Sequence, residues 1–274
     1  MEPTLTGTVP QPVTPYQSNP FALIWDGFRS LGANVGPLIL LFLISIAVVI
    51  AFIPGIAVIA LGHSQMTNIL IGSALIFAAL VVAVVIGVRI FAVGVLLYMS
   101  NAQGKKVEFG ELYAMGKPFA LRLAGLSLLM GFIFFGGFLL FIIPGILFIY
   151  WFTMAPYVLV DQNCSITEAL GRSKAMVKGH GWEVYGFLAT YSLISALENI
   201  PVIGSLISLV LGYAYGSANA LRYFQLRDHA EANKPTGPVS GWNYGVIIGV
   251  SVLIVAFIAF FIYTISQPNS NSTY

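Results

Sequence analysis

Residues 119–161 read FALRLAGLSLLMGFIFFGGFLLFIIPGILFIYWFTMAPYVLVD, and this stretch decides the fold. Only its fourth and last residues are charged, and Pro144 and Gly145 divide it into two apolar arms. A helix of about 20 apolar residues spans the hydrocarbon core of a bilayer, and proline interrupts a helix because it lacks a backbone N–H. The stretch therefore predicts a tight transmembrane hairpin with arms over 119–143 and 146–160.

The rest of the chain has the same character. Of its 274 residues, 58% are hydrophobic and 8% are charged, whereas soluble domains carry roughly 25% charged residues. The composition and the runs predict an all-α polytopic membrane protein with seven spans. The apolar segments are 37–61, 69–99, 119–143, 146–160, 181–199, 202–224 and 244–266. The expected divisions are a disordered N-terminal tail (1–20), a six-span helical membrane domain (21–228), a linker (229–243), a seventh transmembrane helix (244–266) and a short outer tail (267–274).

The positive residues predict how the spans are oriented. Arg29 precedes the first span, and the cations between spans fall into every second loop. The alternate loops, around His63, Pro144 and Pro201, contain no Lys or Arg. Because cytoplasmic loops carry the excess of Lys and Arg, the N-terminus is expected in the cytoplasm and the C-terminus outside the cell membrane. The other cations, which lie between the spans or at their ends, are Lys105, Lys106, Lys117, Arg122, Arg172, Lys174, Lys178, Arg222, Arg227 and Lys234.

Three Ile-Pro motifs predict three helical hairpins. Pro54, Pro144 and Pro201 each fall toward the outer end of the first arm of a helix pair. Gly55 and Gly145 follow two of these prolines, and glycine tolerates the positive φ at which a chain can reverse or kink. The motif is also short enough to recur by chance in such a composition, so a true threefold repeat and a coincidence both stay open.

A short amphipathic helix is expected on the cytoplasmic side before each hairpin. The first begins with Asn19 as its cap and Pro20 at its opening position. Ile24, Trp25 and Phe28 follow at helical spacing and predict its apolar stripe. The second lies around residues 108–113 and has the same pattern.

The third amphipathic helix is basic. Ser165 and Glu168 form a capping box at its start, and Gly179 can end it. Amphipathic basic helices lie in the membrane interface, where they meet anionic headgroups, so its cations are candidate lipid ligands. The alternative is that these helices only pack beneath the bundle. The candidate headgroup ligands are Arg172, Lys174 and Lys178.

Two of the expected spans carry small residues on one face. Gly241, Gly245 and Gly249 are spaced four residues apart in the last helix, as are Gly212 and Gly216 in the sixth. Such faces let membrane helices approach closely. The last helix is therefore expected to pack either on its own bundle or on another subunit, as a homo-oligomer or with a membrane protein partner.

Arg89 is the one cation inside an apolar run. If the second span begins near Ile69, Arg89 can reach the inner interface while residues 90–99 continue as a helix at the surface. If the span ends near Met99, the guanidinium lies deeper and marks a functional site. The first interpretation is preferred, because the ten carboxylates all fall in loops or at span ends.

Motifs of soluble enzymes are absent from the sequence. There is no phosphate loop of the Walker type, no His-Glu-x-x-His and no Gly-x-Ser-x-Gly. His63, His180 and His229 lack metal-ligand spacing. A net charge of +2 without a dense basic run makes nucleic acid a poor partner. We expect no catalytic cluster, no metal and no cofactor, and membrane lipids as the main partners.

A set of short runs follows the proline of the central hairpin. They are IPGI (143–146), YW (150–151), APYVLVD (155–161), EALGRS (168–173) and KGH (178–180), with Pro144, Gly145, Pro156, Asp161, Glu168 and Arg172 as the motif residues. These runs resemble a bacterial family of integral membrane proteins. That family comprises the membrane domain fused to some glycerophosphodiester phosphodiesterases, together with stand-alone six-span relatives, and the resemblance covers about 21–228.

The resemblance implies a membrane domain rather than an enzyme. The fused enzymes carry catalysis in a soluble barrel with a His-Arg-Gly motif, and this chain has neither. The seventh span also exceeds the six of the stand-alone relatives. The favoured function is a non-enzymatic membrane protein that binds lipids or partner proteins in envelope maintenance. The alternative is a transporter whose path runs near Arg89, Asp161 and the helices broken at Pro54, Pro144 and Pro201.

Overall fold

The computed structural model describes residues 15–61, 65–140, 142–196, 204–231 and 238–266, and every regular element in these ranges is a helix. This confirms the predicted all-α class. In chain order the elements are α1 (Pro20–Ser30), the 3-10 turn η1 (Leu31–Asn34), α2 (Val35–Ile50), α3 (Ile53–Leu61), α4 (Met66–Ala102), α5 (Phe109–Gly116), α6 (Ala120–Leu140), α7 (Ile142–Phe152), α8 (Ala155–Asp161), α9 (Ile166–Val177), α10 (Gly181–Ser195), α11 (Gly204–Glu231) and α12 (Gly241–Ser266).

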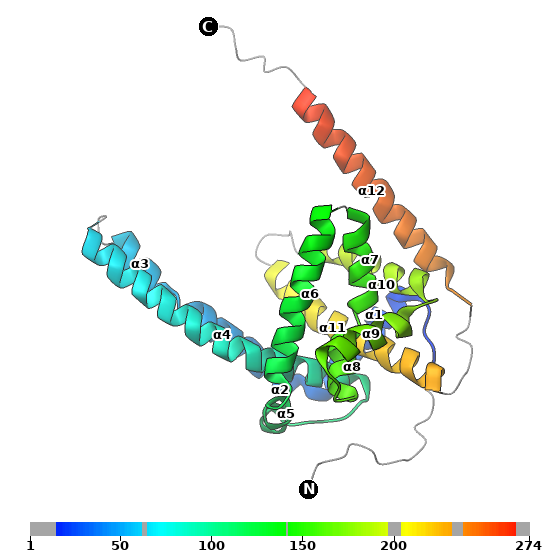
Figure 1. Ribbon diagram of the computed structural model, residues 1–274, viewed down its shortest axis with the longest axis horizontal. Coiled ribbons are helices and arrows are strands. Elements are labelled where there is room, and N and C mark those ends of the chain that lie inside the picture. The colour runs from blue at the N-terminus through cyan, green and yellow to red at the C-terminus, as the bar shows by residue number, and fades with distance from the viewer. Residues whose placement is uncertain (1–14, 62–64, 141, 197–203, 232–237, 267–274) are drawn as a thin grey trace.

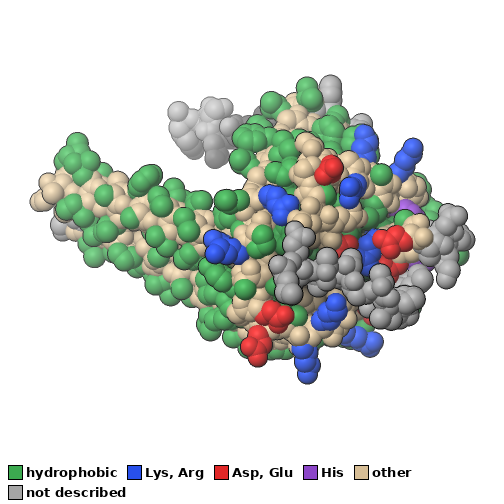
Figure 2. Space-filling view, turned by 60° about the horizontal axis from the view of Figure 1, so that its bottom comes forward, with side chains coloured by type: hydrophobic (Ala, Val, Ile, Leu, Met, Phe, Trp, Pro, Cys, Tyr) green, Lys and Arg blue, Asp and Glu red, His purple; other side chains and the backbone are tan. Residues whose placement is uncertain are grey.

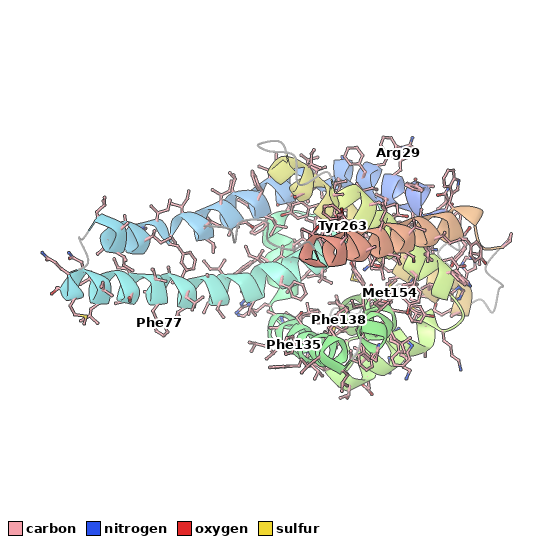
Figure 3. The ribbon with its side chains drawn as sticks, turned by 90° about the horizontal axis from the view of Figure 1, so that it is seen from above. Arg29, Phe77, Phe135, Phe138, Met154 and Tyr263 are labelled. Carbon is pink, nitrogen blue, oxygen red and sulfur yellow. The ribbon has the colours of Figure 1, made fainter. Side chains whose placement is uncertain are left out.

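Long, exposed apolar helices indicate a membrane protein. Within the described chain, four stretches are long and apolar enough to cross a bilayer. The most apolar windows of the first two are only 11% buried, so their side chains face away from the protein. Phe77 on α4 and Phe135 on α6 point outward and are 66% and 70% exposed (Figure 3). Lipid is the solvent that suits such surfaces. The four stretches are Pro20–Leu61, Met66–Ala102, Ala120–Leu140 and Pro144–Asp161.

The last three of the seven predicted spans are not among these four. Helix α10 has 15 residues, and α12 contributes a shorter apolar stretch, Gly241–Phe257. Helix α11 has 28 residues but buries polar side chains, among them Asn219 and Arg222. The number of spans therefore stays a prediction.

The helices form arms that project from a common base (Figure 1). The pair α3/α4, the pair α6/α7 and the single helix α12 extend in different directions, while α1, α5, α8 and α9 gather where these arms meet. The largest hydrophobic core lies in this base. Leu97 of α4, Leu123 of α6 and Leu159 of α8 are each fully buried there. The arms are thus anchored at one end and exposed along most of their length.

Helix α4 runs from a projecting arm into the base. Its first half is largely exposed and α3 packs on it, whereas Ala92, Val93 and Leu97 in its second half are buried in the base. The expected continuation of residues 90–99 as a helix is seen, and its place at the membrane surface stays a prediction. The second half is covered because α6, α8 and α11 pack on it.

The glycines of the Ile-Pro motifs permit close helix packing rather than a reversal. Among the described glycines, only Gly104 and Gly179 have positive φ, so the expectation of a positive-φ reversal is wrong at Gly55 and Gly145. A Cβ on Gly55 would lie 2.6 Å from Ile76 Cγ1 across the α3/α4 contact. A Cβ on Gly145 would lie 2.6 Å from the ring of Phe138 across the α6/α7 contact.

The chain turns of these hairpins cannot be compared with the prediction. The connection after α3 (62–64), residue 141 and the third motif at Pro201 lie outside the described residues. The prolines that are described sit inside the first turn of their helices, Pro54 in α3 and Pro144 in α7. The first turn of a helix tolerates proline because it does not need the missing N–H. Pro144 and Gly145 therefore lie inside α7 rather than between the two arms as predicted, and α6 ends earlier, at Leu140.

Local sequence signals for the amphipathic helices are confirmed. Asn19 Oδ1 accepts a hydrogen bond from Phe21 N at 3.0 Å and caps α1. The capping box of Ser165 and Glu168 opens α9, and Gly179 lies just beyond its end with φ of 93°. These features form because each needs only neighbouring residues.

Of the predicted apolar stripe of α1, only Ile24 packs on the bundle. Leu23, Ile24 and Gly27 face α11, whereas Trp25 and Phe28 are exposed. A Cβ on Gly27 would lie 2.4 Å from the carbonyl oxygen of Ala214, so α1 and α11 are in backbone contact at this point. Helix α1 therefore presents apolar surface on two sides, one to the protein and one outward.

Helix α12 docks on α10 through Asn243 rather than through its glycines. Asn243 is fully buried, and a Cβ on Gly186 of α10 would lie 2.2 Å from Asn243 Oδ1. By contrast, Gly241, Gly245 and Gly249 are exposed, and added Cβ atoms there would meet no described atom within 4 Å. Packing of this glycine face on its own bundle is thus not what the described residues show, and pairing with another subunit stays a prediction.

Of the two glycines predicted to form a packing face in the sixth span, only one lies at a close helix contact. A Cβ on Gly216 of α11 would lie 2.6 Å from the ring of Tyr98 on α4, so the expected close packing occurs at this position. A Cβ on Gly212 would meet no described atom within 4 Å. Helix α11 runs from Gly204 to Glu231 and α12 starts at Gly241, so both ends of the predicted linker (229–243) are helical, while residues 232–237 lie outside the described chain.

Candidate functional site

One end of the molecule is cationic. Figure 2 shows Lys and Arg side chains spread over the base, while the outer part of the projecting α3/α4 arm is covered by hydrophobic side chains. The cations are on connections and helices that meet at the base, which agrees with the alternation of charge along the sequence. The exposed cations of the described chain are Arg29, Lys105, Lys106, Lys117, Arg172, Lys174 and Lys178.

Helix α9 presents a basic stripe, which consists of Arg172, Lys174 and Lys178. The side of α9 that carries Ala169 and Val177 is buried against the base. Arg172 and Lys174, two residues apart, lie on either side of this buried face, Lys178 follows the last turn, and all three side chains are exposed. Arg172 Nη1 donates to Gln162 Oε1 at 2.6 Å, and Lys174 Nζ lies 3.9 Å from the centroid of the Trp151 ring. These contacts orient the side chains without neutralising them. The basic stripe is therefore open to an anion.

The nearest carboxylate, Glu168, is held mainly by the start of its own helix and interacts more weakly with the charge of Arg172, one turn further on. Glu168 accepts from the backbone N–H of Ser165 at 2.9 Å and from its hydroxyl at 2.9 Å. These hydrogen bonds lower the pKa of Glu168, so the carboxylate stays ionised and committed to the capping box. The positive residues of α9 keep their charge for an external partner.

Exposed aromatic side chains border the base. Trp25 stacks on Phe28 at 5.5 Å, and Trp182 lies 4.9 Å from Tyr244, at the starts of α10 and α12. The three described tryptophans that are most exposed, Trp25, Trp182 and Trp242, all belong to this set. Trp and Tyr concentrate where membrane proteins cross the interface between hydrocarbon and headgroups. The base therefore has the side chains of a protein at headgroup depth.

The motif residue Asp161 is a structural anchor. Its Oδ2 accepts from the hydroxyl of Tyr223 at 2.5 Å and from Arg227 Nη1 at 2.9 Å. Arg227 also contacts Asp228. Asp161 ends α8, and the other two residues belong to α11, so this ion pair ties the central hairpin to α11. Pro156, another motif residue, lies in the first turn of α8.

Arg89 has a different surrounding from Asp161. It is partly exposed on α4 and makes no hydrogen bond or ion pair with any residue that the structure describes. It lies about 20 Å along the helix from Ala102. Pro54 packs near the other end of α4, opposite its first turns. Asp161 pairs with Arg227 rather than with Arg89, Pro201 lies outside the described residues, and the transport path stays a prediction.

A buried polar cluster, which the sequence analysis missed, lies beneath residues 15–19. Arg222 of α11 has no solvent exposure, and none of its three guanidinium nitrogens has a hydrogen-bond partner among the described residues. The ring of Tyr16 lies 5.2 Å from its Cζ. The hydroxyl of Tyr16 donates to Oε1 of Glu183 at 3.3 Å, and Glu183 is 2% exposed. Tyr16 therefore contacts both a buried cation and a buried carboxylate.

Two histidines flank the same tyrosine. His180 Nδ1 lies 3.4 Å from the Tyr16 hydroxyl, and the ring of His229 meets the Tyr16 ring edge-on at 5.3 Å. Burial raises the pKa of Tyr16 far above its ordinary value, against the opposing effect of the Arg222 charge and with a smaller raising effect of the Glu183 charge. The hydroxyl therefore stays protonated and able to donate. The histidines that look scattered in the sequence are partly collected by the fold.

The N-terminal tail is shorter than the predicted 1–20. Residues 15–19 pack on the base and Pro20 starts α1, while residues 1–14 lie outside the described chain.

The sequence contains only a weak signal for the buried polar cluster. Asn219, Arg222 and Gln225 are spaced three residues apart in an apolar helix, which places them on one face. Arg222 thus lies between two polar residues on one helical face, whereas most of the other cations lie in or beside loops.

Comparison of the chain with models of protein families, with curated proteins and with solved structures found no match. The resemblance to the membrane domain of the phosphodiesterases therefore stays a prediction, carried by its motif residues.

Proposed function

We propose that this protein is a non-enzymatic integral membrane protein that acts in envelope maintenance. Its cytoplasmic base binds anionic lipids or negatively charged partner proteins. The proposal includes seven spans, a cytoplasmic N-terminus, an outer C-terminus and membership of the family named above. The observation that carries it is the basic stripe of α9, exposed beside aromatic side chains typical of the interface.

The expected strength of binding follows from the charge of the stripe. A basic residue near an anionic membrane surface contributes about 1 kcal/mol. Three such residues give about 3 kcal/mol, or roughly a hundredfold preference for anionic over neutral headgroups. Trp151 beneath Lys174 holds that ammonium group at the surface.

The test is lipid retention in native mass spectrometry. The full chain is reconstituted in nanodiscs of phosphatidylglycerol and phosphatidylcholine, released gently, and its retained lipids are counted. The triple variant Arg172→Glu, Lys174→Glu, Lys178→Glu is expected to retain at least tenfold less phosphatidylglycerol than the wild type. The matched control, Lys105→Glu, Lys106→Glu, Lys117→Glu, changes the net charge equally on other exposed cations of the base. Equal loss in both variants would show a general charge effect and refute a site on α9.

A further inference from the structure

The strap, residues 15–19, crosses the ends of three helices and covers the buried cluster. Gln225 Nε2 donates to the carbonyl of Pro15 at 3.0 Å, and Asn243 Nδ2 donates to the carbonyl of Ser18 at 2.7 Å. The hydroxyl of Ser18 donates to the carbonyl of Pro238 at 3.2 Å. Single hydrogen bonds of this kind contribute little each, so the strap can open without unfolding the helices beneath it.

The groups beneath the strap are incompletely satisfied and are of two kinds. The donors are the three nitrogens of Arg222. The acceptors are Glu183 Oε2, Gln225 Oε1 and Asn243 Oδ1, none of which has a hydrogen-bond partner among the described residues. A buried guanidinium or carboxylate without full hydrogen bonding is costly, so this arrangement favours a ligand that completes it.

The chemistry of that ligand follows from the two kinds of group. A guanidinium binds phosphate best, through paired N–H groups. A carboxylate and an amide oxygen are complementary to a protonated primary amine, which has three N–H donors. The matching group is a phosphate that carries a primary amine, as in phosphoethanolamine. A quaternary amine, as in phosphocholine, has the same charge but no N–H to donate.

Tyr16 holds the place of such a ligand. Its ring covers the Arg222 guanidinium where the phosphate would bind, and its hydroxyl donates to Glu183 where the amine would bind. Beside the strap, Phe21 of α1 packs edge-on against the exposed Trp242 of α12 at 5.6 Å, and exposed aromatic side chains of this kind are typical of the membrane interface.

We propose that residues 15–19 are a displaceable strap over a headgroup site, in which Arg222 binds the phosphate and Glu183 and Gln225 bind the primary amine of a phosphoethanolamine group. This site is separate from the basic stripe of α9. Retention of phosphatidylglycerol tests the stripe, whereas discrimination between ethanolamine and choline tests the site, so either proposal can fail alone.

The experiment uses the full chain in nanodiscs with equal phosphatidylethanolamine and phosphatidylcholine, with retained lipids counted by native mass spectrometry. The wild type is expected to retain phosphatidylethanolamine in preference. Tyr16→Ala removes the competing contacts and is expected to raise that retention about tenfold. Tyr16→Phe, which loses only the hydroxyl, is expected to raise it less. Tyr113→Ala, at an exposed tyrosine of α5, is the control and should change nothing.

A variant of the amine-binding side tests the assignment of groups. Glu183→Gln is expected to bind both lipids alike while keeping its helical circular dichroism. If Tyr16→Ala retains the two lipids equally, or if Glu183→Gln keeps the wild-type preference, the proposal is overturned. Competition by soluble phosphoethanolamine separates the sources: displacement of the lipid identifies the free compound as a sufficient ligand, and no displacement identifies the lipid headgroup.

Discussion

The contact between α1 and α11 offers a sharp test of the fold, through Gly27→Ala. An added Cβ would lie 2.4 Å from the carbonyl oxygen of Ala214, 2.7 Å from Ala218 Cβ and 2.8 Å from Ala218 N. Two of these atoms are backbone, so no side-chain rotation relieves the clash and α1 has to move. Overpacking of this kind costs about 3 kcal/mol, and the better helix propensity of alanine returns about 1 kcal/mol. The net expectation is a loss of about 2 kcal/mol.

The assay is thermal unfolding of the purified protein in one detergent. A loss of about 2 kcal/mol corresponds to a Tm lower by roughly 4–8 °C in a domain of this size. Gly32→Ala is the matched control, because an added Cβ at Gly32 would meet no described atom within 4 Å. It should keep or raise the Tm. A Gly27→Ala protein as stable as its control would refute the close contact between the two helices.

Three further changes test the anchors of the base. Asp161→Asn breaks the ion pair with Arg227 at 2.9 Å and is expected to cost about 2 kcal/mol, seen as a lower Tm; an unchanged Tm would remove Asp161 as an anchor. Ser165→Ala should destabilise the start of α9 by about 1 kcal/mol, read as faster amide exchange there, with the first turn of α5 as the unaffected reference. The lowered pKa of Glu168 adds a pH dependence: protection of this turn is full above pH about 4.3 and is lost as pH falls through the lowered value, so loss at neutral pH would contradict it. Gly186→Ala places a Cβ 2.2 Å from Asn243 Oδ1 and is expected to release α12 from α10, which new protease cleavage before Gly241 would show. Gly245→Ala is the control, because its Cβ would meet no described atom within 4 Å, and it should leave the cleavage pattern unchanged.

Local features of this fold were predictable and long-range ones were not. The caps at Asn19 and Ser165 depend on residues three positions apart, so the sequence pattern is sufficient for them. The role of Gly55 was misjudged because its reason lies in Ile76 on another helix, which periodicity does not reveal. The buried half of α4 was missed for a similar cause: an apolar run faces lipid or protein with the same composition.

The two classes of cation show what charge counting leaves out. The positive-inside rule treats Arg172 and Arg222 alike, since both follow an apolar segment. In the fold, Arg172 is exposed on the basic stripe, whereas Arg222 is buried beneath Tyr16. The neighbours of each residue distinguish them. Arg172 lies three residues after a buried alanine, but Arg222 lies between Asn219 and Gln225 on one helical face, and a face of polar residues within an apolar helix is stable only when something polar covers it. The strap is that cover, so the pattern in α11 implies a partner for this face even before the N-terminal residues are placed.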